Sequence, residues 1–271
     1  MDRRNFLKTG GIALLGSLTT GSAMALATPG ALGGEGADKK ATVALAMNHF
    51  GVSEADLKKV LAAALEKGGE YADLFFEHTI TNSIRLMDGA VNNSYSNIDY
   101  GVGVRVLIGD QSGYAYVENI TLEDMLKAAR TAARIASANK GNKPLNLTEN
   151  YYTVASPWEE VSLKDKMPYL QKLNDQIFAL DKRVHKVQAS QSDTTSHIFF
   201  CNSEGVMFYD YRPMVTLGAV CIMEENGRTE NGYAARAYRR GFDFLSDEVV
   251  DVIAREAVDQ TSLLFKAIKP R

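Results

Sequence analysis

Apolar residues recur along the chain with two different periods, and each period predicts a different kind of element. Over residues 53–69 they return every three or four positions and stop at a pair of glycines, which is typical of one helix face and its end. Over residues 71–117 they return every second position, most clearly in 100–108, which predicts β-strands. Turn signals at 88–89 and 109–113 indicate that these strands are antiparallel neighbours.

The same order returns later in the chain. A polar connection over 139–157 separates a helix that ends at about Ala138 from a third helix, and strands follow from about Val184 to Arg239. Turns are predicted at 202–205 and at Asn226-Gly227. Capping residues mark the helix starts at Thr121 with Asp124, at Ser162 with Asp165, and at Ser246.

We therefore predict an α+β fold in which antiparallel strands are flanked by helices, with two similar helix–strands–helix subdomains. The expected divisions are an export signal at 1–27, a flexible linker at 28–45, a first subdomain at 46–140, a connection at 141–160 and a second subdomain at 161–271. The two halves show no repeated sequence, so a duplication is only weakly indicated.

The first residues have the layout of an export signal: a basic start, a modest apolar stretch and small residues before a cleavage site. Arg3 and Arg4, followed by Asn-Phe-Leu-Lys, resemble the twin-arginine motif, and Ala25 lies in two overlapping Ala-x-Ala sites. The expectation is export by the twin-arginine route to the periplasm. The alternative is a chance basic N-terminus on a cytosolic protein.

Composition excludes several classes of protein. The 271 residues are 45% hydrophobic and 23% charged, with a formal net charge of -3 and two cysteines. Such a chain is too apolar to be disordered and too poor in cysteine to be a disulfide scaffold. The slight acidity argues against a nucleic-acid partner, because phosphate binding needs concentrated Lys and Arg.

Few side chains are arranged for catalysis or metal binding. No two of the four histidines have the helical spacing of a metal site, although His185 and His197, both in predicted strands, could meet across a sheet. A hydrogen-bonded structural histidine is the favoured reading of each. Cys201 and Cys221 have apolar neighbours and are interpreted as buried thiols, with a disulfide between them as the alternative.

Gly101 and Gly103 lack the third glycine of a phosphate-binding loop. They leave one strand face without side chains, where another backbone could approach, but glycines that simply let the sheet bend are the favoured reading. With Arg105 and Arg236, which has Arg239 and Arg240 nearby, they are the candidate peptide- or partner-binding residues. Glu224-Glu225 is interpreted as part of a hairpin tip.

Two stretches of the chain together resemble one known family. They comprise 71–75, 99–106 and 113–116 in the first stretch, and 203–206, 211–213, 224–228 and 230–232 in the second. Their order and spacing resemble the N-terminal half of the TldD/PmbA proteins, historically called modulators of DNA gyrase, over almost all of the chain after residue 50. The second stretch is more similar to the TldD branch.

The resemblance implies a metallopeptidase that cuts unfolded or extended peptides added to a sheet. It also implies a zinc site in the full-length protein and assembly as a homodimer or with a paralogous TldD/PmbA-type subunit. The family's zinc ligands, a His-Glu-x-x-x-His helix and a later cysteine, belong to its C-terminal half. This sequence has no His-Glu pair, so no catalytic or metal residue is predicted and no cofactor is expected on this chain. It reads as part of a longer peptidase or, alternatively, as a non-catalytic exported peptide-binding or assembly module.

Overall fold

The computed structural model describes residues 39–136, 152 and 154–267. The strands are β1 (Tyr71–Met87), β2 (Ala90–Ile108), β3 (Gln111–Val117), β4 (Val184–Asn202), β5 (Met207–Glu225) and β6 (Arg228–Tyr238). The helices are α2 (Lys39–Phe50), α3 (Glu54–Leu65), α4 (Leu122–Ala136), α5 (Leu163–Leu180) and α6 (Asp247–Leu264), with 3-10 helices η2 (Trp158–Glu160) and η3 (Phe242–Phe244).

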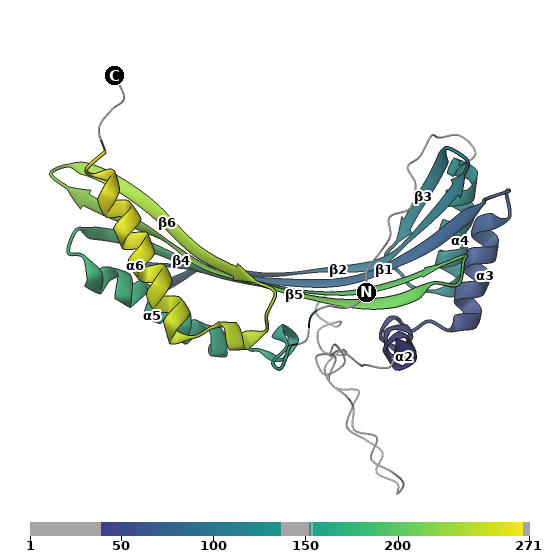
Figure 1. Cartoon of the computed structure of the whole chain (residues 1–271), viewed down its shortest axis with the longest axis horizontal. Helices are drawn as coiled ribbons and strands as arrows, with labels where there is room; N and C mark the ends of the chain where they lie inside the picture. Colours follow the sequence, from purple (N-terminus) through teal and green to yellow (C-terminus); the bar gives the residue numbers. More distant parts are fainter. Residues whose placement is uncertain (1–38, 137–151, 153, 268–271) are drawn as a thin grey trace, which may run out of the picture.

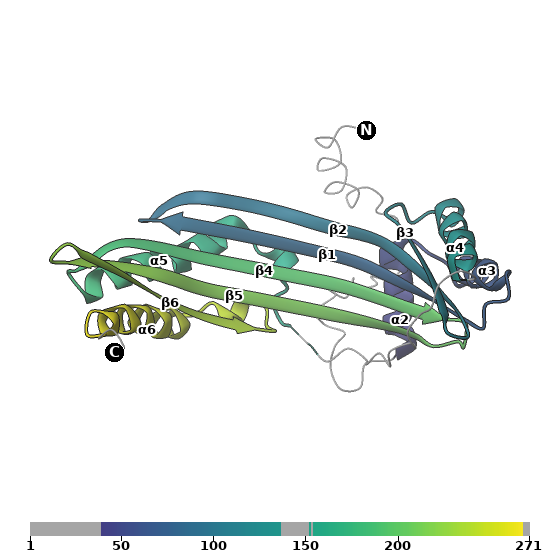
Figure 2. The same ribbon diagram turned by 90° about the horizontal axis from the view of Figure 1, so that it is seen from above.

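All six strands form one antiparallel sheet in the order β3-β2-β1-β4-β5-β6. The order is symmetric about the β1–β4 pair, and each half of the chain supplies two long strands and one shorter strand, with helices before and after them (Figure 2). The predicted α+β fold and the repeated element order are therefore confirmed. The two halves share a single continuous sheet.

The hairpin turns follow from residues that tolerate a left-handed backbone. Asp88 and Gly89 have φ of 50° and 80°, and Asn226 and Gly227 have φ of 53° and 76°. Positive φ at both central residues is the geometry of a type I′ turn, which matches the twist of the strands that it joins. The turns predicted at these two dipeptides are confirmed, and Glu225 pairs with Arg228 beside the second one, so Glu224-Glu225 does lie at a hairpin tip.

The helices that the structure describes all cover one face of the sheet. Figure 1 shows the sheet as an arch, with α3 and α4 outside one raised end and α5 and α6 outside the other. The predicted caps hold the helix starts: Ser162 and Asp165 form a capping box on α5, and Ser246 accepts a hydrogen bond from the Val249 N–H of α6. None of the described helices lies on the concave face.

This arrangement divides the interior into two apolar cores. The first packs α2, α3 and α4 against one end of the sheet, with Leu57, Phe76 and Val104 fully buried. The second packs α5 and α6 against the other end, with Leu173, Leu217 and Ile253 fully buried. Between the two cores, the helix-covered face of the central strands carries polar side chains.

Two sequence-based expectations differ from the structure. Helix α2 begins at Lys39, inside the segment 28–45 that we expected to be a linker. Cys201 and Cys221 are both free thiols, each buried in a different core, so the alternative of a disulfide between them is wrong. Burial raises the pKa of both thiols, to about 12 for Cys201, and they remain protonated and inert.

The export signal at 1–27, with Arg3, Arg4 and Ala25, lies outside the described residues, as does most of the connection 141–160. Among the helices that the structure describes, none combines the length and apolar character needed to cross a bilayer.

Gly113 provides a direct test of the packing of α4 on β3. A Cβ at this position would overlap the backbone oxygen of Ala132 and the backbone nitrogen of Ala136, neither of which can move aside as a side-chain end could. We expect Gly113→Ala to lower the free energy of unfolding by about 2 kcal/mol or more, measured by urea denaturation. Ser112→Ala, one residue earlier, is the matched control and should change it by less than about 0.5 kcal/mol. Equal stability of both variants would contradict the close α4–β3 contact.

Candidate functional site: the polar cluster between the two cores

Antiparallel register brings the polar residues together beneath the middle of the sheet. His78 of β1 lies opposite His197 of β4, and His197 lies opposite Tyr211 of β5. Side chains alternate between faces along a strand, so these residues and Tyr209 all lie on the helix-covered face. His49 arrives from the last turn of α2 and Glu159 from η2. We call these six residues the histidine cluster.

His197 is held from both sides. Its Nδ1 lies 2.6 Å from the Tyr209 hydroxyl and its Nε2 lies 2.9 Å from Glu159 Oε1. Burial raises the pKa of Tyr209 far above its usual value, so the hydroxyl keeps its proton and donates it to Nδ1. With Nδ1 accepting that proton, Nε2–H donates to the Glu159 carboxylate, so both ring nitrogens of His197 have a defined partner.

Glu159 receives three hydrogen bonds. Besides His197, the hydroxyls of Thr195 and Tyr211 donate to its Oε2, each over 3.2 Å. Burial works to raise the pKa of Glu159, but hydrogen bonds, first of all from His197, outweigh it and the pKa is lowered. The carboxylate is therefore ionised and its lone pairs are occupied by donors.

The other two histidines form the outer part of the cluster. His49 Nε2 and His78 Nδ1 lie 2.9 Å apart, and the His49 ring stacks on the His197 ring with centroids 4.4 Å apart. Burial lowers the pKa of His49 to about 4, with further contributions from His197 and His78. Burial, followed by the charge of His197, also lowers the pKa of His78. At neutral pH both imidazoles are uncharged, and they link α2 to the sheet.

A buried ion pair lies next to the cluster. Lys166 of α5 is 3% exposed and its Nζ is 2.5 Å from Asp193 Oδ2 on β4. Asp193 also accepts hydrogen bonds from Gln191 and Asn82, at 2.9 and 3.0 Å. The Lys166 ammonium also lies 5.3 Å from the centroid of the Trp158 ring. Its positive charge is therefore stabilised by both the Asp193 carboxylate and the face of an aromatic ring.

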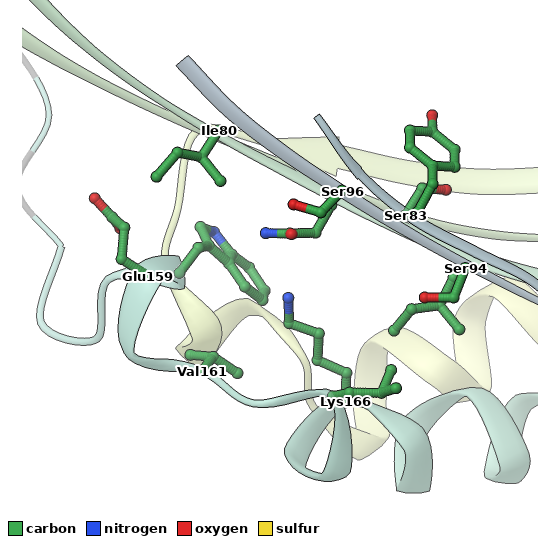
Figure 3. A pocket seen from close by; sticks show the side chains of 12 residues that line it. Ile80, Ser83, Ser94, Ser96, Glu159, Val161 and Lys166 are labelled. Carbon is green, nitrogen blue, oxygen red and sulfur yellow. The ribbon is translucent and has the colours of Figure 1, made fainter. Parts of the chain in front are cut away.

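These residues border an open cavity of about 430 Å³ under β1 and β2. Figure 3 shows Lys166 extending from α5 toward the strands that carry Ser94 and Ser96, with Val161 and Glu159 on the η2 side. The lining offers hydroxyls, an amide and apolar surface. Its two charged groups, Lys166 and Glu159, already have partners, so the cavity can hold a polar segment but presents no activated nucleophile.

The cluster does not have the geometry of a metal site. Across the described ranges, no three His, Cys, Asp or Glu side chains are placed to hold a metal ion. Both His197 nitrogens are engaged by Tyr209 and Glu159, and stacking on His49 keeps the ring nitrogens from converging on one point. Ligands of a tetrahedral metal must converge in that way.

The expected binding residues lie elsewhere and are not brought together. The ring of Tyr116 lies against Gly101 and that of Tyr114 against Gly103, so aromatic side chains cover the face that the glycines leave bare. Arg105 binds Asp73 through two hydrogen bonds, and Arg236, near the opposite edge of the sheet, lies 2.7 Å from Glu256 of α6. Peptide binding by these four residues stays a prediction.

Sequence reasoning missed the histidine cluster. The possibility that His185 and His197 meet across a sheet is wrong, because both belong to β4, which continues without a turn from Val184 to Asn202. The favoured reading, a hydrogen-bonded histidine, holds for His197. The partners of His197 are 38 or more residues away in the sequence, apart from the tyrosines of β5. The signal that could have revealed the cluster is the alternation of side chains along each strand. His78 and His197 lie an even number of residues from buried positions of β1 and β4, so both share a face with buried residues.

Two family patterns match consecutive parts of the chain. The PmbA/TldA metallopeptidase domain 1 matches residues 72–136, and the PmbA/TldA metallopeptidase central domain matches residues 156–265. Together they include β2 to β6, all of β1 except Tyr71, and every described helix from α4 onward.

Curated relatives share the sequence over the same region. A "Metalloprotease TldD homolog" from Haemophilus influenzae is 32% identical over 211 residues, which cover 73% of this chain and 44% of that protein. "Metalloprotease MJ0996" from Methanocaldococcus jannaschii is 24% identical over 208 residues, covering 73% and 45%. The chain thus spans a little under half the length of these relatives.

Solved structures share the fold. A proposed modulator of a DNA gyrase from Thermotoga maritima superimposes with a TM-score of 0.63 at 19% identity, covering 81% of this chain and 50% of that one. TldE from Thermococcus kodakarensis gives 0.60 at 16% identity, covering 76% and 47%. At such low identity these matches show the shared fold.

The lowered pKa of His49 predicts an acid-sensitive contact between α2 and the sheet. Above pH 6.5 this histidine is neutral in both the folded and the unfolded chain. As the pH falls toward 4, the unfolded chain binds a proton that the folded chain does not, so the free energy of unfolding decreases. Between pH 7.5 and 5 we expect His49→Gln to lose roughly 1 kcal/mol less stability than the unmodified chain, allowing for screening by solvent, which reaches part of the His49 side chain.

Denaturant titrations at the two pH values measure this difference. His185→Gln, outside the cluster at the start of β4, is the control and should retain the full pH dependence. A His49→Gln variant that loses as much stability as the unmodified chain would contradict the stacked arrangement.

Proposed function

We propose that this chain forms the N-terminal half of a TldD-like metalloprotease. The proposal is based on its matches to the first and central PmbA/TldA metallopeptidase domains. The observation that carries the proposal is the run of two consecutive family domains in their expected order, with 32% identity to a TldD homologue of which the chain covers 44%. In this proposal the remainder of the enzyme, which the relatives contain beyond the matched region, supplies the catalytic site.

The residues of this chain do not fit the zinc ion that a metalloprotease requires. The sequence lacks a His-Glu pair, and the described histidines that come close are stacked and hydrogen-bonded to partners other than a metal. We therefore assign no step of hydrolysis to this chain. Its proposed part is to supply a rigid sheet for assembly of the enzyme and for holding its substrate.

The proposed substrate is an unfolded or extended peptide, and the proposed partner is a second copy or a paralogous TldD/PmbA-type subunit. The edges of this long sheet support both, because unpaired strand edges bind extended backbones with little sequence preference. The twin-arginine-like residues Arg3 and Arg4 support export to the periplasm as a further part of the proposal.

The second candidate function is a non-catalytic exported module that binds peptides or assembles with other proteins. It is favoured by the complete pairing of the charged groups in the histidine cluster and the cavity, which leaves no reactive group there. Reading the gene beyond Arg271 separates the two functions. An in-frame His-Glu-x-x-x-His segment supports the peptidase, and an immediate stop codon would exclude it for this chain.

Metal content tests the proposed division of labour. The purified 271-residue chain, incubated with zinc and then dialysed, should contain far less than one zinc ion per molecule and should not cleave unfolded casein. Elemental analysis and a fluorescent casein assay measure the two properties. His49→Gln serves as the control, and it should leave both unchanged. One zinc ion per chain that is lost in His49→Gln would overturn our description of the cluster.

Peptide retention tests the substrate class and the glycine face together. The immobilised chain should retain an unfolded peptide more strongly than a folded protein of similar charge. If a peptide uses the face of Gly101 and Gly103, the Tyr114→Ala/Tyr116→Ala variant should bind it several-fold more tightly, since the two rings would no longer cover that face. Tyr233→Ala, which removes an exposed tyrosine from β6, is the matched control. No preference for the unfolded ligand would count against strand addition.

A further inference from the structure

Half of β2 is an unpaired edge of the sheet. β1 pairs with β2 along its whole length, whereas β3 pairs only with Val102–Ile108 (Figure 2). Among the described strands, residues 90–101 therefore have a neighbour on one side only. Residues 90–99 are all exposed, and the side chains of Val91, Tyr95 and Ile98 are 52%, 56% and 49% exposed.

Hydrogen-bond parity shows which backbone groups face outward. The carbonyl of Leu107 accepts from Glu70 N–H on the β1 side, and the carbonyl of Tyr100 accepts from the Tyr116 hydroxyl on the β3 side. Backbone groups alternate along an antiparallel strand, so odd-numbered residues bond to β1 and even-numbered residues point away from it. The N–H and C=O groups of Ser94, Ser96 and Ile98 thus lie on the free edge, and a bulge opposite Arg85/Leu86 ends the regular pairing near Asn92.

This edge lacks the usual protection against pairing. Residues 90–98 contain no charged residue, proline or glycine. The other edge strand, β6, carries Arg228, Glu230 and Arg236. Charged side chains and prolines are the devices that keep exposed edges from joining other strands. An unprotected edge in an otherwise well-charged chain is typical of a surface that is paired in its working state.

The sequence of the edge is suited to pairing with itself. Residues 93–97 read Asn-Ser-Tyr-Ser-Asn, the same in both directions. Antiparallel pairing about a two-fold axis at Tyr95 would place Asn93 opposite Asn97, Ser94 opposite Ser96, and Tyr95 opposite its copy. Even-numbered residues meet even-numbered ones in this register, which the outward hydrogen bonds require. Asp99 falls opposite Val91, so like charges do not face each other.

We propose that the free edge of β2 pairs with the same edge of a second copy of this chain, joining the two sheets into one of twelve strands. The choice of a second copy as the partner rests on the subunit pairing proposed above. The inference does not depend on whether the assembled protein is a protease. An extended peptide added to the same edge is the competing occupant, and the experiments distinguish it.

A cysteine at the two-fold axis tests the register. Facing residues in a non-hydrogen-bonded antiparallel pair have Cα atoms about 4.5 Å apart, within the range of a disulfide. The two natural cysteines are buried and do not compete. Under mild oxidation, Tyr95→Cys should form a covalent dimer at least tenfold faster than Tyr233→Cys, which places a thiol on the β6 edge. Equal rates would overturn the proposal.

Charges placed at facing positions provide a second test. In Asn93→Lys/Asn97→Lys, lysines face lysines across the axis, and we expect the dimer to weaken at least tenfold by sedimentation equilibrium. Asn93→Glu/Asn97→Lys changes the same two exposed positions but places opposite charges face to face, so the dimer should persist. Loss of the dimer in both variants, or an unmodified chain that stays monomeric at 100 µM or binds only added peptide at this edge, would overturn the proposal.

Discussion

The pairing of β1 with β4 is the contact on which the rest of the structure depends. Among the described strands it is the one ladder that joins the first half of the chain to the second, running from Asp73 opposite Asn202 to Met87 opposite Gln188. Side-chain hydrogen bonds follow it on both faces, including Thr79 to Ser196, Thr81 to Thr194 and Asn82 to Asp193. Each apolar core draws residues from both sides of this seam, so neither half buries its helices without the other.

The polar middle of the sheet explains why the seam has one register. A slip of β4 by one residue against β1 would move His197 and Asp193 to the concave face, away from His78, and would place the hydroxyls of β4 against the helices. A buried pair such as Lys166–Asp193 adds little net stability because removing two charges from water is costly, but breaking it leaves an unpaired buried charge. We interpret the histidine cluster and this pair as determinants of register and helix docking. This role also accounts for the satisfied, unreactive state of their groups.

Local features of the structure were predictable from the sequence, and long-range ones were not. Asp88-Gly89, Asn226-Gly227 and the helix caps depend on neighbouring residues, so their chemistry could be read directly. The contact between His49 and His197 depends on which strands are adjacent and on where α2 docks, which no local pattern encodes. The covering of Gly103 by Tyr114 likewise follows from the β2–β3 register, which the sequence alone does not reveal. The family was recognisable because its glycine-punctuated strands keep a fixed order.

Hydrogen exchange measured across a urea series tests most directly the claim that β1–β4 pairing makes the two family domains one unit. The account predicts that amides of β1 and β4, and those of α4 and α6 in the two separate cores, lose protection together in one global unfolding reaction. Protection of one core that persists after the other has exchanged, with β1 and β4 separating between the two transitions, would contradict it.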